Sequence, residues 1–342
     1  MTQPQRDPSS IAPANANRRA LLLGGGALVL LTAGFSAFTL KGGVTASRAL
    51  RVGRTGKGGY DVIMRVAGIE PKGLKIQYSD FQSGHLQVEA FNGGSLDFGG
   101  MSEIPPVFAA ASSIQSFKQI ATVNADVNNQ VILVPGKSEI KTLADLKGKK
   151  VGYVRATTAQ YFLIQMLASV GLTWNDIEPV SLSVPDGTAA FSRGSLDAWA
   201  IYGFPIQRAL ANDGARVLKT ALGFLSGNYI VSAHVNALAD PALSHAIGEY
   251  LASYKRAFAW QNQHWQEWSE ALAKEIDVPL PYVVEQVKGR SAPTTLLPVS
   301  ENSIKSQQQV ADVFFKAGLI PKHVDVRPLW DNRYNSIIEQ VS

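Results

Sequence analysis

Cysteine is absent from the 342 residues of this chain. Its absence excludes disulfide bonds, thiolate metal sites and cysteine nucleophiles. The five histidines are scattered without the spacing of a metal site, so we expect neither a metal nor a cofactor. The chain also lacks the G-x-S-x-G, Walker and H-E-x-x-H motifs. These absences favour a binding protein over an enzyme.

A surplus of charge of one sign is also missing. The net charge is +5, but residues 1–46 hold four basic residues and one acidic residue, and without them it falls to +2. Basic and acidic residues are therefore nearly equal in number, and the chain has no long basic stripe. This pattern excludes nucleic acid as a partner. Hydrophobic residues make up 46% of the chain and charged residues 17%, which is typical of a folded protein with room for two domains.

Residues 1–46 have the pattern of an export signal. Arg18-Arg19 precedes the apolar run 20–38, and the small residues 44–46 offer a cleavage site. The arginine pair resembles a twin-arginine signal. An uncleaved membrane anchor is the alternative, since about 20 apolar residues are enough to span a bilayer. Either reading places the remainder outside the cytoplasm, in the periplasm.

The chain repeats one segment. Residues 90–98 and 190–198 share six of nine positions, namely Ala, Phe, Gly, Ser, Leu and Asp. Each copy follows an amphipathic stretch and precedes a predicted strand. Two copies of a helix–turn–strand unit indicate two α/β lobes of one design, with a ligand site between them.

The alternation of strand and helix patterns supports two lobes. Residues 49–123 read as a βαβαβ series, which is typical of a parallel sheet. The buried strand 131–134 is expected to cross to the second lobe, and strand 229–233 to return. The predicted division is an N-terminal segment 1–46, one lobe of 47–131 with 234–342, and a second lobe of 132–233. The run 243–268 predicts one helix with an aromatic, buried face.

Four loops that follow strands and precede helices are candidates for a ligand site. They are residues 54–59, 79–85, 99–102 and 155–160. Helix starts present free N–H groups and partial positive charge, which suits an oxyanion. Ser83, Ser102, Thr157 and Thr158 add hydroxyls, although a Ser or Thr at this place can also serve only as a helix cap. The pattern predicts an anion site, provided that the loops share one cleft.

Several short motifs, in this order and spacing, carry a family resemblance. They are Phe81 with Ser83-Gly84 and Glu89-Ala90, residues 103–108, residues 131–134 followed by 143–148, residues 197–201, Pro293-Thr294-Thr295 and residues 319–322. With them the chain resembles the periplasmic aliphatic-sulfonate-binding proteins of ABC importers, within the wider nitrate/sulfonate/taurine-binding group. The match runs from about residue 50 to residue 330.

The resemblance implies an α/β fold of the type II periplasmic-binding-protein kind, with two lobes joined by a two-strand hinge. It places the ligand against Ser83, Gly84, His85, Gly100, Met101, Ser102, Thr157, Thr158 and Trp199. We expect Arg155, or Lys57 beside Gly58, to supply positive charge. Alkyl groups would rest on Trp199, Tyr202 and Phe204, although Trp199 and Phe204 fit a lobe core equally well.

The implied function is capture of an alkanesulfonate-like anion and its delivery to an ABC permease with its ATPase subunit, by a protein that is a monomer. Taurine, nitrate or a pyrimidine vitamin precursor on the same scaffold is the alternative. Residues 202–205 read Tyr-Gly-Phe-Pro where relatives commonly have Trp-Asp-Pro-Tyr, which indicates a changed pocket. Related desulfinases use a cysteine nucleophile, so that enzyme mechanism is excluded.

Overall fold

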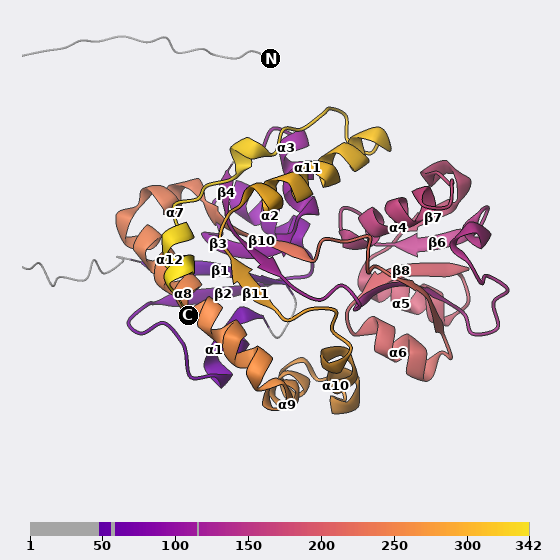
Figure 1. Cartoon of the computed structure of the whole chain (residues 1–342), viewed down its shortest axis with the longest axis horizontal. Helices are drawn as coiled ribbons and strands as arrows, with labels where there is room; N and C mark the ends of the chain where they lie inside the picture. Colours follow the sequence, from indigo (N-terminus) through magenta and orange to yellow (C-terminus); the bar gives the residue numbers. More distant parts are fainter. Residues whose placement is uncertain (1–47, 56–58, 115, 342) are drawn as a thin grey trace, which may run out of the picture. The chain divides into compact units, whose positions relative to one another are not determined.

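The computed structural model describes residues 48–55, 59–114 and 116–341, and there the chain forms two β-sheets (Figure 1). The first sheet contains β1 (Leu50–Thr55), β2 (Ile76–Phe81), β3 (Phe98–Ser102), β4 (Phe117–Asn124), β10 (Asn228–His234) and β11 (Thr295–Leu297). The second contains β5 (Gln130–Val134), β6 (Lys150–Tyr153), β7 (Glu178–Ser181), β8 (Ala198–Tyr202) and β9 (Arg216–Thr220). The predicted export signal or anchor, 1–46, lies outside the described residues.

The two sheets share one strand arrangement. Three parallel strands form one edge of each, in the orders β2-β1-β3 and β7-β6-β8. An antiparallel strand follows in each sheet, β10 in the first and β5 in the second. The parallel pairing expected from the sequence is therefore found for three strands of each sheet. Each sheet as a whole is mixed, because β10 in the first and β5 in the second run antiparallel to their neighbours.

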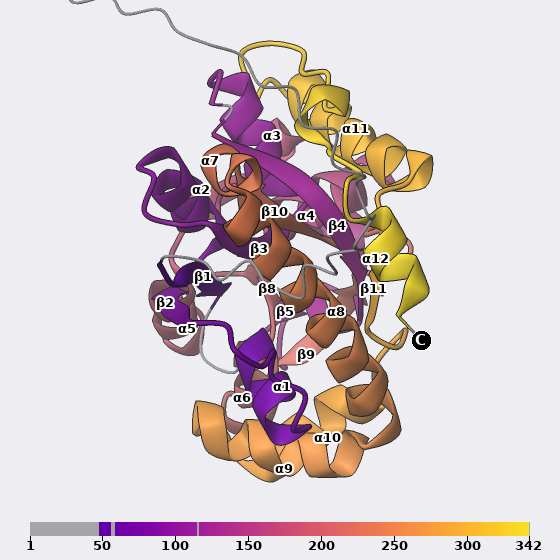
Figure 2. The ribbon, with the colours of Figure 1, turned by 90° about the vertical axis from the view of Figure 1, so that its left-hand side faces the viewer.

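Helices complete each half of this arrangement. Between the strands lie α1 (Tyr60–Val66), α2 (Gly84–Asn92), α3 (Ile104–Ala111), α4 (Thr158–Ala168), α5 (Val184–Ser192) and α6 (Pro205–Asn212). After β10 come α7 (Val235–Ala239), α8 (Pro241–Gln263), α9 (Trp265–Ile276), α10 (Leu280–Lys288), α11 (Glu301–Lys316) and α12 (Asn335–Gln340). Single 3-10 turns are found at Leu143–Leu146, Trp174–Asp176 and Arg327–Leu329. Helix α9 lies beside α1, and α10 packs on α9 (Figure 2). No helix of the described residues is both long and apolar enough to cross a membrane.

Residues 131–134 of strand β5 form a continuous apolar run because both faces of this strand are covered. Val131 and Leu133 pack in one cluster with residues of α5 and α6, whereas Ile132 and Val134 pack in another with residues of α4. Successive strand side chains point to opposite faces, so a strand covered on both faces has to be apolar at every position. Helix α4 lies on one side of the second sheet and α5 and α6 on the other (Figure 1).

The repeated segment forms the same structure twice. In each copy a helix ends, a glycine with positive φ turns the chain (Gly94 at 67°, Gly194 at 70°), and a parallel strand begins. The hydrogen bonds are also equivalent, because the N–H of Asp97 donates to the carbonyl of Arg51 and that of Asp197 to the carbonyl of Lys150, both at 2.9 Å. The helix–turn–strand unit inferred from the sequence is confirmed.

The two connections between the sheets lie against each other. One runs from β4 to β5 and the other from β9 to β10. Asn124 Nδ2 donates to Asn228 Oδ1 at 3.0 Å, and Gln130 Nε2 donates to the hydroxyl of Tyr229 at 3.0 Å. Strand β10 pairs within the first sheet from residue 228 onward. The division of the chain into lobes as such stays a prediction.

The long helix expected over 243–268 is two helices. Helix α8 ends at Gln263, and α9 begins at Trp265 after His264, whose backbone leaves the helical range at φ −111° and ψ 44°. The break lets Phe258 and Trp268 pack into the same core cluster from two directions. The prediction of a single helix was therefore wrong, while its aromatic core face is confirmed by the burial of Tyr250, Tyr254 and Phe258.

The two repeat aspartates differ in burial, and this generates a matched test. Asp97 is 1% exposed and binds Arg51 and Arg48, whereas Asp197 is exposed. Burial raises the pKa of Asp97, but hydrogen bonds from the two arginines outweigh it and hold this pKa well below its usual range. The ionised form is thus stabilised in the folded state, and this contribution to stability is present above about pH 4 and lost as the pH falls.

We expect Asp97→Asn to lower the free energy of unfolding by about 3 kcal/mol at pH 7, because it leaves two guanidinium groups without their carboxylate. Asp197→Asn, at the equivalent exposed position, should cost less than about 1 kcal/mol. Urea unfolding of both variants measures the difference. Equal losses in the two variants would contradict the role assigned to the buried ion pair.

Candidate functional site

A cavity of about 260 Å³ lies where strands of both sheets end and helices begin. It is lined by Thr55, Tyr60, Ser83, Gly84, Gly100, Met101, Ser102, Pro105, Asn129, Gln130, Thr157, Thr158, Tyr202, Gly203 and Tyr229. Thr55, Ser102 and Tyr202 are the last residues of parallel strands, and ligand sites of α/β proteins lie at such strand ends. All the lining side chains are uncharged, so the wall offers dipoles and hydroxyls.

Three helices begin at this wall, and their first turns supply backbone N–H groups. Helix α2 follows Ser83, α3 follows Ser102 and Glu103, and α4 follows Thr157. The Thr157 hydroxyl caps its own helix, accepting from the N–H of Ala159 at 3.2 Å and donating to the carbonyl of Val154 at 2.7 Å. The hydroxyls of Ser102 and Thr158 have no hydrogen bond within the described residues, and so are available to a ligand.

Glycine shapes the wall at Gly100. A Cβ there would lie 2.3 Å from the hydroxyl of Tyr60, a distance that no side chain tolerates. The carbonyl of Gly100 accepts from Gln87 Nε2 at 3.0 Å, and the same amide nitrogen donates to Thr55 Oγ1 at 2.7 Å. Gln87 is fully buried, and through these two hydrogen bonds its amide joins the ends of β1 and β3.

Two tyrosines add phenolic donors. Burial raises the pKa of Tyr202 to about 12 and moves that of Tyr229 in the same direction. Both hydroxyls are therefore protonated at neutral pH and able to donate. The Tyr229 oxygen already accepts from Gln130 Nε2, which leaves its O–H for another acceptor. The cavity is thus supplied with neutral donors, an arrangement that can hold an anion without a basic side chain.

The structure places most of the predicted site residues at this cavity. Ser83, Gly84, Gly100, Met101, Ser102, Thr157, Thr158 and Tyr202 line it. The side chain of His85 is 52% exposed and that of Arg155 is exposed, and neither is part of the lining. Lys57 and Gly58 lie outside the described residues. That these residues bind a ligand stays a prediction.

Trp199 belongs to the core of the second sheet. It is 1% exposed and packs with Phe191, and a Cβ at Gly187 would lie 2.8 Å from its indole nitrogen. The sequence left two roles open for Trp199, contact with the ligand and packing in the core, and the structure places it in the core. The reason is strand alternation, since Trp199 points to the face covered by α5 while Tyr202, three residues on, ends the strand at the cavity.

Sequence reasoning missed five lining residues: Tyr60, Pro105, Asn129, Gln130 and Tyr229. Thr55 and Gly203 also line the cavity, and both lie in stretches that the sequence indicates as part of a pocket, 54–59 and 202–205. Asn129 and Gln130 lie at the start of the recognised crossing strand, and a search for polar residues flanking that strand would have found them. No sequence signal marks Tyr229, which reaches the cavity only because β10 is inserted between β3 and β4.

A buried carboxylate lies between the cavity and the connections. Glu103 is 4% exposed, and its Oε2 accepts from the hydroxyl of Ser226 at 2.6 Å, while Oε1 has no partner within the described residues. Ser226 belongs to the connection between β9 and β10. Burial raises the pKa of Glu103 to about 7, against opposing hydrogen bonds. Among the described residues no group of three His, Asp or Glu side chains could hold a metal ion.

Comparisons with known proteins point to one family. The NMT1/THI5-like family model matches residues 70–221. An aliphatic sulfonates-binding protein of Escherichia coli (strain K12) is 35% identical over 254 residues, which cover 74% of this chain and 78% of that protein. The chain superposes on the alkanesulfonate-binding protein of Xanthomonas axonopodis pv. citri bound to MOPS with a TM-score of 0.76, at 30% identity, over 84% of this chain and 99% of that one.

The periplasmic aliphatic sulphonate binding protein of Escherichia coli gives a TM-score of 0.74, at 32% identity, over 84% of this chain and 93% of that one. The α/β fold of the periplasmic-binding-protein kind, expected from the sequence, is confirmed.

The buried Glu103 generates a prediction about pH. Its folded-state pKa of about 7 lies above the ordinary value of 4.5, so the folded protein holds a proton that the unfolded chain releases. The free energy of unfolding should therefore fall as the pH rises from about 4.5 to 7, by about 3 kcal/mol from this group. In Glu103→Gln this component is absent, because the amide does not titrate.

The measurement is urea unfolding of both proteins at several pH values between 4 and 8. Since other groups titrate in both, the informative quantity is the difference between the two proteins, which should grow in favour of the variant as the pH rises. Parallel pH profiles would show that Glu103 does not carry this dependence.

Proposed function

This chain belongs to the family of aliphatic-sulfonate-binding proteins, and we propose that it captures an organosulfonate anion in the cavity between its two sheets and delivers it to an ABC permease with its ATPase subunit. The binding residues we propose are those of the cavity wall, above all Ser83, Ser102 and Thr158 with the starts of α2, α3 and α4.

The observation that carries this proposal is a cavity with many donors and with no charged side chain among the described residues that line it. A sulfonate is the anion of a strong acid and is never protonated at neutral pH, so it needs donors and no base. Backbone N–H groups at helix starts hold such an oxyanion well. Buried hydroxyls and phenols add further hydrogen bonds, which are stronger when the acceptor is charged.

Transport, and not turnover, is the role that fits this chain. The relatives named above are binding proteins, and the chain has no cysteine to act as the nucleophile of related desulfinases. With an export signal predicted at 1–46 and a periplasmic relative, we propose that the protein acts in the periplasm as a monomer. Lys57 remains a proposed source of positive charge at the cavity.

The direct test is a thermal-shift and calorimetry screen of the full-length protein, refolded from denaturant to remove bound ligand. The panel holds alkanesulfonates of graded length, taurine, nitrate and sulfate. A ligand at a thousand times its Kd stabilises the folded state by about 4 kcal/mol, which gives a clear shift of Tm. We expect alkanesulfonates to shift the Tm. A shift with taurine or nitrate alone would keep the scaffold and replace the substrate.

The hydroxyl of Thr158 gives a sharper test of the site. Thr158→Val should weaken alkanesulfonate binding about tenfold, because a charge-assisted hydrogen bond is lost at constant side-chain shape. Thr188→Val is the matched control, since its hydroxyl only donates to the Val184 carbonyl of its own helix at 2.8 Å. Calorimetric Kd values for both variants decide the matter, and unchanged binding in Thr158→Val would remove this residue from the site.

A further inference from the structure

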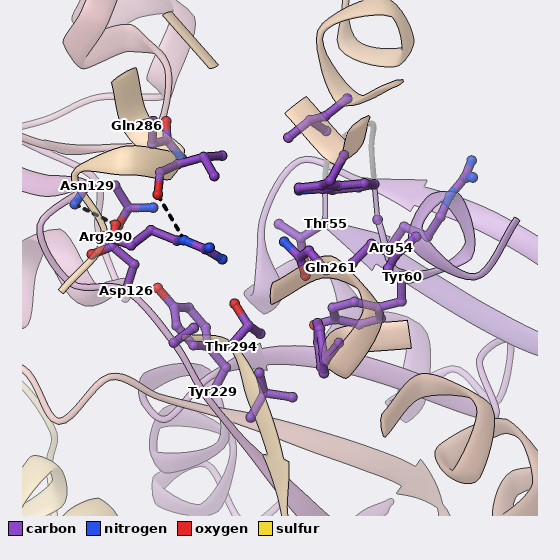
Figure 3. A pocket seen from close by; sticks show the side chains of 18 residues that line it. Arg54, Thr55, Tyr60, Asp126, Asn129, Tyr229, Gln261, Gln286, Arg290 and Thr294 are labelled. Atoms are coloured by element: carbon purple, nitrogen blue, oxygen red, sulfur yellow. Dashed lines mark hydrogen bonds between the residues drawn. The ribbon is translucent and has the colours of Figure 1, made fainter. Parts of the chain in front are cut away.

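A second cavity of about 310 Å³, drawn in Figure 3, adjoins the first. The two share Thr55, Tyr60, Asn129 and Tyr229 in their walls. Each alone is at or near the lower end of the range of about 300–1,000 Å³ for small-molecule sites, while together they lie well within it. We call the second cavity the distal chamber.

Residues of helices α1, α8, α9 and α10 form much of the distal chamber. Its apolar wall comes from Ile63 of α1, Phe258 of α8, and Trp268 and Leu272 of α9. Such a wall suits the hydrocarbon part of a ligand whose anionic head occupies the first cavity. The chamber also has polar lining residues, among them Arg290, Gln286 and Gln261.

Arg290 is the unusual residue of this chamber. Its Nε donates to the Val287 carbonyl at 3.0 Å and its Nη1 to Asn262 Oδ1 at 3.3 Å, so three of the five guanidinium donors have no partner within the described residues. No carboxylate of the described residues forms an ion pair with it. In Figure 3 its guanidinium extends toward the middle of the chamber, with Gln261 and Tyr60 opposite.

The other charges of the wall are already engaged. Arg54 binds Asp61 and Asp80, each at 2.7 Å. Asp126 accepts hydrogen bonds from the backbone N–H groups of Asn128, Asn129 and Ser291. Arg290 therefore differs from Arg54 in having unused donors. Burial lowers the pKa of Arg290 and Asp126 is close enough to oppose this effect, but no ion pair joins the two side chains within the described residues. A partly buried guanidinium with unused donors favours the arrival of an anion.

Two amide side chains of the chamber are also unsatisfied. Oε1 of Gln261 and Oε1 of Gln286 are buried without hydrogen-bond partners in the described residues. Since the oxygen and nitrogen of an amide are assigned from their hydrogen bonds, either side chain can present its N–H₂ instead. A carboxylate in the chamber would accept from these groups and from the guanidinium fork together.

We propose that the distal chamber receives the far end of the ligand, and that Arg290 makes the protein selective for organosulfonates that carry a carboxylate at the end opposite the sulfonate. This inference rests on the proposed function, because it assumes that the sulfonate occupies the first cavity. Arg290 is a specificity residue in this arrangement. A plain alkanesulfonate fills the apolar part of the chamber and makes no hydrogen bond with the guanidinium, whereas a terminal carboxylate accepts from its unused donors.

The test compares two series of ligands of graded chain length, alkanesulfonates and ω-carboxyalkanesulfonates, by calorimetry on the full-length protein. At the best length the carboxylated ligand should bind about ten- to a hundredfold more tightly than the alkanesulfonate of equal length. In Arg290→Gln the ratio of the two Kd values at equal chain length should fall to about one. This ratio is independent of any loss of affinity common to both series, and measurable alkanesulfonate binding shows that the variant is folded. Arg65→Gln is the control, since Arg65 is exposed, pairs with Glu275 and lines neither cavity.

Two results would overturn the inference, and they are distinguishable. If alkanesulfonates bind but carboxylated ligands show no advantage, or keep it in Arg290→Gln, the selectivity is refuted and the proposed function stands. If no sulfonate of either series binds the unaltered protein, the proposed function fails and the inference with it.

Discussion

Three helices begin at the wall of one cavity, and the N–H groups in the first turn of a helix have no partner within it. This shortage of acceptors is the constraint on which the rest of the site depends. Nearby hydroxyls supply only part of the acceptors that these N–H groups need. The Thr157 hydroxyl caps α4, while those of Ser102 and Thr158 have no hydrogen bond within the described residues. Under the proposed function a sulfonate accepts hydrogen bonds from several of these donors, and no charged side chain among the described residues of the wall competes with it.

The scaffold that holds these helix starts in place is one unit used twice. Both copies turn at a glycine with positive φ and anchor an aspartate on the neighbouring strand, but only the first copy buries that aspartate. Arg48 and Arg51 compensate the buried charge of Asp97, whereas Asp197 remains in solvent. The two copies therefore have the same backbone geometry but differ in the charge environment of their aspartate.

The connections between the sheets are where the cavity, the buried carboxylate and the distal chamber meet. Tyr229 and Asn129 line both cavities, and Ser226, in one connection, binds Glu103. A movement of the two sheets about these connections would therefore alter both cavities and the surroundings of Glu103 at once. Hinge segments of this kind absorb backbone changes during domain closure.

The sequence by itself determined the two-lobed α/β design, the chain crossing at 131–134 and the helix starts of the cavity, because repeats, apolar periodicity and caps are local in the chain. Only the tertiary structure decided that Trp199 is core and that Arg155 lies outside the cavity wall, since the direction of a side chain depends on what covers each face of its strand. The same holds for Tyr229 and Arg290, which reach the site from residues far along the chain. Their positions follow from strand insertion and helix packing, for which no local pattern exists.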